Sequence, residues 1–156
     1  MTEPTTQLGE AFGQVGMSHR FLVRIDRGAY DLGTWSKVSG LSVSWAKISY
    51  RPGENNDEVV VPGNVSYPNI KLSRAACSDS ATVQKWLATT SVRHEVLGCA
   101  IHMIDFLNMP VVSWELRQFF PISWSVTDFD SSGARAAIET LELAHTGFLQ
   151  DGVSQR

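Results

Sequence analysis

The sequence is poor in cysteine, the residue that can stabilise a fold through disulfide bonds. Only Cys77 and Cys99 are cysteines among 156 residues. Residues 1–18 contain neither Lys nor Arg and no long apolar run, so they do not match a secretory signal. We therefore expect two free thiols, not a disulfide, in a protein that is assembled in the cytoplasm.

Charge and long apolar runs are also scarce. Charged residues make up 19% of the chain, and 13 Lys and Arg stand against 16 Asp and Glu, for a net charge of −3. A nucleic-acid binder usually carries a basic face, and a membrane-spanning helix needs about 20 apolar residues. We expect neither specific nucleic-acid binding nor membrane insertion by this chain alone. Hydrophobic residues still reach 43%, which is enough for one folded core.

Motifs that carry catalytic or cofactor chemistry are missing as well. Gly28 and Gly33 have the spacing of phosphate-loop glycines, but Thr34-Trp35 stands where that loop needs Lys and Ser or Thr. His102 and His145 could be neighbours on adjacent strands, yet two imidazoles without a third ligand make a poor metal site. The sequence therefore predicts no catalytic residues, no metal site and no cofactor.

Alternating apolar and polar residues predict a mainly β protein. Pro121 is expected to separate two strands, and Gly and Pro clusters mark turns at the spacing of a sandwich or barrel. The fold class is a β-sandwich or open barrel of about seven or eight strands with one flanking helix. The expected extended segments are 20–26, 34–38, 41–50, 59–62, 97–106, 111–119, 122–129 and 136–148.

One segment, 78–90, has the pattern of a helix. Asp79 or Ser80 can cap its first turn, and Val83, Trp86 and Leu87 form an apolar stripe at helical spacing. Because so short a helix is unstable alone, we expect the stripe to pack on the sheet.

The chain divides into three parts on this interpretation. Residues 1–18 form a mobile N-terminal arm, 19–149 a single domain and 150–156 a C-terminal tail.

Two features of the predicted sheet point to contacts with other molecules. Residues 41–62 form a long hairpin with a polar tip, which we expect to project because its loop exceeds a tight turn. Few Pro or Lys guard the sheet edges, and pairing with copies of the same chain would satisfy them. Several strand faces carry small polar residues where a solvated surface usually has long charged ones: Ser42, Ser44, Ser123, Ser125, Thr127, Thr140 and Glu142.

A set of short motifs, in order, resembles one known family. They are FLVRID at 21–26, VSGL at 38–41, YRPG at 50–53, VPG at 61–63, YPNIKLSR at 67–74, VVSWELRQFFPISWS at 111–125 and AIETLELAHTGF at 137–148. Together with Trp86 they cover about residues 20–148. The chain resembles the inner-tube proteins of contractile phage tails and of phage-tail-like contractile injection systems.

The resemblance implies a structural role without catalysis. Six copies would close into a ring, and rings would stack into a tube around a lumen that carries cargo, for which protein is a candidate. It implies sheath, baseplate and spike proteins and a tube cap or terminator as partners, in a particle that could be released from the cell. The hairpin would reach a neighbouring subunit or ring, through Tyr50, Pro52, Gly53, Glu54, Pro62 and Gly63. The lumen-facing candidates are Ser42, Ser44, Thr140 and Glu142.

Other functions remain open from the sequence. The motifs do not separate an injection-system tube from the tail tube of a contractile-tailed bacteriophage or prophage. The strand count and the five tryptophans also fit a small-molecule-binding β-barrel, which would need an apolar interior and an open mouth. Most tryptophans are expected in the core, with some left to anchor a subunit interface.

Overall fold

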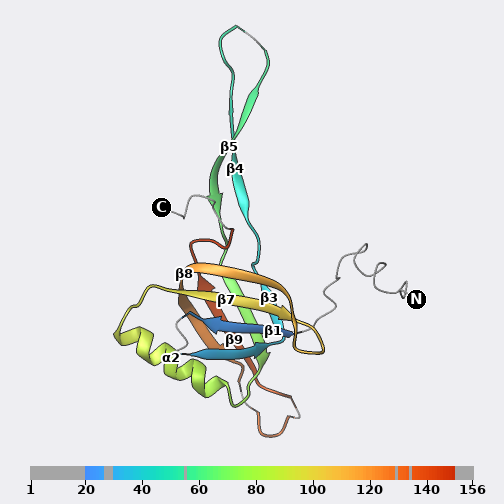
Figure 1. Ribbon diagram of the computed structural model, residues 1–156, viewed down its shortest axis with the longest axis vertical. Coiled ribbons are helices and arrows are strands. Elements are labelled where there is room, and N and C mark those ends of the chain that lie inside the picture. Colours follow the sequence, from blue (N-terminus) through green and yellow to red (C-terminus); the bar gives the residue numbers. More distant parts are fainter. Residues whose placement is uncertain (1–19, 27–29, 55, 129, 134, 150–156) are drawn as a thin grey trace, which may run out of the picture.

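The structure is a computed structural model that describes residues 20–26, 30–54, 56–128, 130–133 and 135–149. The predicted arm 1–18 and tail 150–156 lie outside these residues. Within them the fold is mainly β with one flanking helix, as predicted, and has nine strands (Figure 1). The elements are β1 (Arg20–Ile25), β2 (Asp31–Trp35), β3 (Lys37–Ser39), β4 (Ser44–Tyr50), β5 (Val59–Ser66), β6 (Ile70–Ala75), α2 (Ser80–Val92), β7 (Leu97–Ile104), β8 (Pro110–Val126) and β9 (Ile138–Ala144).

Seven strands form one antiparallel sheet in the order β2-β1-β7-β8-β9-β6-β3, and β4 and β5 form a separate two-stranded ribbon. The strands at the two ends of this order, β2 and β3, are separated in the chain by Ser36 alone. The sheet must therefore curl round until its ends meet. Ser36 closes the junction, because its N–H and its hydroxyl both donate to the Ser73 carbonyl, at 3.1 and 2.9 Å.

The connection through Ser36 does not pair β2 with β3. Among the described residues β2 forms a ladder with β1 alone and β3 with β6 alone, so open edges remain in the main sheet as expected. β8 pairs with β7 through residues 110–119 and with β9 through 120–126. Among the described residues, each half of β8 is therefore part of a ladder on one side only. Within the same residues, the ribbon β4–β5 has no pairing partner along either of its outer sides.

The expectation that Pro121 ends a strand is wrong. β8 runs through it for 17 residues. Pro121 lies beside a register shift in a half of β8 that is paired on one side, which is where sheets tolerate a proline. The change of partner falls close to Gln118, whose φ of 44° bends the strand. Two further boundaries differ: the segment 34–38 is split between β2 and β3, and β6 is a strand that the alternation analysis did not propose.

The core lies inside the curled sheet and under α2. Trp86 on the helix stacks on Phe119 of β8, with ring centroids 5.6 Å apart. The helix matches the predicted segment closely. Asp79 occupies the N-cap position, but its side chain makes no capping hydrogen bond. The buried apolar side chains that fill the interior are Val23, Ile25, Leu32, Trp35, Ile70, Leu72, Val83, Trp86, Cys99, Ile101, Leu116, Phe119, Leu141 and Leu143.

Candidate functional site

The ribbon β4–β5 extends away from the rest of the molecule (Figure 1). Its register pairs Ser44 with Ser66 at the base and Tyr50 with Val59 toward the tip. A hairpin was predicted over 41–62, and the structure confirms it with a longer return strand. We call residues 44–66 the hairpin. It has one irregularity, between Trp45 and Lys47, where the pairing shifts by one residue.

The hairpin exposes large apolar side chains. Trp45, Ile48 and Tyr50 are each about half exposed, at 54%, 50% and 53%. On the return strand Val60 and Val65 are similarly exposed. Isolated apolar residues are normal at a surface, but a contiguous group on one projecting element marks an interaction surface. Alternation along the strands places Ile48, Tyr50, Val59 and Val61 on one face, which we call the apolar face.

All six residues predicted for subunit contacts lie in this hairpin. Tyr50 ends β4, and Pro52, Gly53 and Glu54 form the exposed tip. On the return strand Pro62 is opposite Lys47. Gly63 lies against the side chain of Ile48, since a Cβ added there would come within 2.9 Å of it. What these residues contact in another molecule stays a prediction.

A second surface is a polar face on the outside of the sheet half made of β3, β6, β9 and residues 120–126 of β8. Thr140 lies between Ser73 and Ser125, and Glu142 lies between Lys71 and Ser123. Lys71 Nζ is 4.0 Å from Glu142 Oε2, so the opposite charges of these two long side chains offset each other. We call this the polar face. Its members are Lys37, Ser39, Lys71, Ser73, Ser123, Ser125, Thr140 and Glu142.

The four lumen-facing candidates do not lie together. Thr140 and Glu142 belong to the polar face, whereas Ser44 is at the base of the hairpin opposite Ser66 and Ser42 precedes it. Sequence reasoning missed the contributions of β3 and β6. In β6 the alternation of buried Ile70 and Leu72 with outward residues could have revealed them.

Behind the polar face lies a buried ionic network that the sequence analysis also missed. The Arg74 Nε donates to Glu139 Oε2 at 2.8 Å, and Arg74 Nη1 donates to the Leu32 carbonyl at 2.7 Å. Ser80 Oγ and Trp124 Nε1 donate to the same carboxylate, at 2.7 and 2.9 Å. Burial alone would raise the pKa of Glu139, but the hydrogen bonds from Arg74, Trp124 and Ser80 outweigh it and hold the pKa low.

The described titratable side chains do not gather into a metal centre. Within the described ranges no group of three or more His, Cys, Asp or Glu could hold a metal ion. His102 pairs with Leu22 and Ser113 and is therefore not a cross-strand neighbour of His145. Its Nδ1 is 2.6 Å from the Ser113 hydroxyl. Cys99 is buried, which raises the pKa of its thiol.

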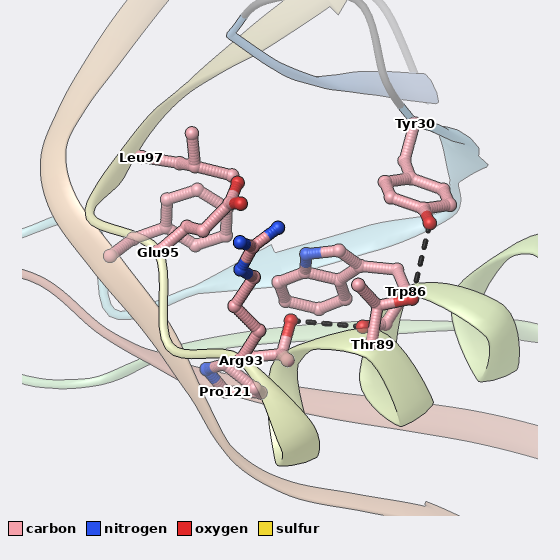
Figure 2. Close-up of a pocket in the computed structure, with 9 residues that line it drawn as sticks. Tyr30, Trp86, Thr89, Arg93, Glu95, Leu97 and Pro121 are labelled. Atoms are coloured by element: carbon pink, nitrogen blue, oxygen red, sulfur yellow. Dashed lines mark hydrogen bonds between the residues drawn. The ribbon is translucent and has the colours of Figure 1, made fainter.

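A depression lies at the C-terminal end of α2, beside aromatic side chains (Figure 2). Trp86 forms part of it, and Tyr30 reaches Thr89 with 3.2 Å between their hydroxyl oxygens. Arg93 and Glu95 are its charged members. Among the described residues that line it, none is a histidine or a cysteine. No described helix is long and apolar enough to span a membrane.

Comparison with known proteins identifies the class to which this fold and these surfaces belong. Residues 17–149 match the family described as T4-like virus tail tube protein gp19. The chain therefore belongs to the tail tube family, which consists of structural tube proteins. None of the curated proteins compared with the chain matches it.

Solved structures share the fold. A chain of the sheath-tube complex of the extracellular contractile injection system PVC, in its extended state, is 22% identical, with a TM-score of 0.69 over 93% of this chain and 95% of that one. A chain of the anti-feeding prophage baseplate is 23% identical, with a TM-score of 0.67 over 86% and 94%. A type six secretion system protein is 12% identical, with a TM-score of 0.51 over 82% and 80%.

Proposed function

We propose that this tail tube protein forms the inner tube of a contractile injection particle, in which six copies close into a ring and rings stack around a lumen. The observation that carries the proposal is the hairpin, whose apolar side chains are left exposed by the part of the chain that the structure describes. A two-stranded hairpin is at best marginally stable by itself in water. Contact with a neighbouring copy would bury its apolar face.

The polar face supports the other half of the proposal, namely a lining for the lumen. Its side chains are short apart from two lysines and one glutamate, and they come from four adjacent strands. A conduit needs a wet surface without large apolar groups to which cargo would adhere. If the ring has six members, the formal charge is 6 × −3 = −18 per ring.

The proposed partners follow from the settings of the similar structures. Those chains come from a sheath-tube complex, a baseplate and a tube-terminating cap. We propose that this chain likewise contacts a sheath, a baseplate and spike, and a cap or terminator, and that protein is the cargo. Assembly takes place in the cytoplasm and needs neither catalysis nor a cofactor. The filled interior argues against a small-molecule-binding barrel, because bulky side chains occupy the space that a ligand would need.

Deleting residues 52–60 tests the role of the hairpin. We expect the domain to stay folded, with an unchanged far-ultraviolet circular dichroism spectrum, and particles to lack tubes in cryo-electron microscopy. Val92→Ser is the matched control, since Val92 is an exposed apolar residue on α2, outside the hairpin. Tubes of stacked rings in the deletion variant would overturn the assignment of the hairpin. A peripheral monomer in intact wild-type particles would overturn the proposed function.

A bacteriophage tail tube is the second candidate, because the matching family is named for a virus. The genes beside this one separate the two. Capsid and DNA-packaging genes would assign the chain to a phage, whereas sheath, baseplate and spike genes without a capsid would assign it to an injection particle.

A further inference from the structure

The base of the hairpin is built differently from its shaft. Among the described residues, β4 and β5 pair with each other and with no strand of the main sheet. The direction in which the hairpin points is therefore set where its two ends enter the body. Three independent contacts gather there.

The first contact is a tight crossing of the two ends of the hairpin. Gly40 precedes β4 with a φ of +89°, and a Cβ at this position would collide with the carbonyl oxygen of Asn69. The same atom would come within 3.2 Å of the Ile70 Cα. Because the obstructing atoms belong to backbone, no side-chain rearrangement could relieve the collision. The backbone that enters the hairpin and the backbone that leaves it are thus pressed together.

The second contact is an aromatic cluster on the returning end. Tyr67 lies against His145 and Phe148, with ring centroids 5.5 and 5.4 Å apart. His145 Nε2 is 3.1 Å from the carbonyl oxygen of Pro68, so the imidazole reaches the backbone of the segment that leaves the hairpin. Gly147, with a φ of +143°, makes room for the cluster, since a Cβ there would come within 2.9 Å of the Tyr67 ring.

The third contact ties this cluster to the body. Asn69 Nδ2 donates to Glu142 Oε1 at 3.0 Å. The Arg117 N–H donates to the Gly147 carbonyl at 2.9 Å, and the Thr146 N–H donates back to the Arg117 carbonyl at 3.1 Å. These bonds fix the segment after β9 to β8, so the cluster cannot move with the hairpin.

We propose that Gly40, Tyr67, Asn69, His145, Gly147 and Phe148 form a clamp that holds the hairpin in one direction in the free subunit. These are positioning residues, and the use of the clamp in assembly depends on the proposed function. A hairpin that is already aimed loses less conformational freedom when it meets the neighbouring copy. Burial lowers the pKa of His145, although hydrogen bonds to the Pro68 and Gly147 backbone oppose this, so the surroundings favour the neutral imidazole.

The direction of the hairpin can be measured in the unassembled, full-length protein by double electron–electron resonance, which gives the distribution of distances between two spin labels. One spin label is attached to the native thiol of Cys77, which is exposed, and the other to the variant Asn56→Cys at the tip. Cys99 is buried with a raised thiol pKa and should not react. We expect one narrow distance distribution, and about a twofold broadening in His145→Ala, because preorganisation is lost.

Two controls separate a clamp from general stability. Gly40→Ala attacks the crossing, and Gly53→Ala introduces similar backbone strain at the tip, where nothing lies within 4 Å of an added Cβ. We expect Gly40→Ala to broaden the distribution and Gly53→Ala to leave it narrow. If Gly40→Ala does not fold, His145→Ala and Phe148→Ala carry the test.

The outcomes distinguish the clamp from the proposed function. A distribution that stays narrow in His145→Ala overturns the clamp, even if the melting temperature falls. A broadened distribution supports the clamp, whatever the wild type assembles into. Wild-type subunits with a narrow distribution that never form tubes in the native particle would instead overturn the proposed function.

Discussion

Arg74 and Glu139 form an ion pair of 2.8 Å whose side chains are almost completely buried, at 4% and 0% exposure. The guanidinium also lies over the Trp35 ring, 4.0 Å from its centroid. The pair joins β6 to β9, and the further bonds from Ser80 and Trp124 bring α2 and β8 to the same carboxylate. One side chain thus connects the helix to the sheet half that carries the polar face.

Removing the charge of Glu139 should destabilise the protein strongly. In Glu139→Gln the Arg74 charge remains buried without its counter-ion, which costs about 3 kcal/mol in the free energy of unfolding. Chemical denaturation with urea measures the loss. Arg24→Gln is the control, because the Arg24–Asp31 pair is longer, at 3.7 Å, and more exposed and should cost less than about 1 kcal/mol. Equal losses in both variants would contradict a special role for the buried pair.

The same ion pair should make stability fall in acid. The pKa of Glu139 is lower in the folded protein than its ordinary value of 4.5, so the folded state holds the ionised form more strongly. Its contribution is complete above about pH 4.5, and it is lost as the pH falls through the lowered value. We expect the difference between the wild type and Glu139→Gln in unfolding free energy to shrink over this range. A difference that stays constant from pH 7 to pH 3 would contradict the assignment.

The sequence predicted the fold class, the helix and the hairpin because each depends on local periodicity. It did not predict that β8 continues through Pro121. The strand can continue because β8 changes its pairing partner from β7 to β9 just before Pro121, which leaves one side of the strand unpaired there. Closure of the sheet at Ser36 likewise depends on strand order, which alternation does not encode.

The candidate surfaces show the same division. The six hairpin residues are close in sequence, and they lie together in the structure. The polar face is formed by the register in which β3, β6, β8 and β9 pair. Reasoning from each strand alone found Thr140 and Glu142. It missed Ser73, which lies between Lys37 of β3 and Thr140 of β9. Glu139 carried a usable signal, since it alternates in phase with the apolar residues Leu141 and Leu143.

If the polar face lines the lumen, large reagents should fail to reach it in assembled tubes. The test uses Ser73→Cys in a Cys77→Ser background and a 5-kDa polyethylene-glycol maleimide. The thiol should react in the free subunit. In sheath-free tubes it should react at least about tenfold more slowly, because the reagent must enter a narrow channel. Gln84→Cys on the exposed surface of α2 is the control, and it should react in both states. Equal protection of both thiols, or of neither, would contradict a lumenal position for Ser73.

The apolar face of the hairpin should matter for assembly and hardly at all for folding. Ile48 is half exposed in the free chain, so Ile48→Ser should change the unfolding free energy by no more than about 0.5 kcal/mol. Burial against a neighbouring copy would make the same substitution cost about 2 kcal/mol per contact, and a tube repeats that contact at every subunit. Lys47→Ser is the matched control, because adjacent strand residues point to opposite faces. Tube length in electron micrographs and the amount of pelletable protein should both fall sharply for Ile48→Ser. Both should remain near the wild-type level for Lys47→Ser. A stronger effect of Lys47→Ser would place the contact on the other face of the hairpin.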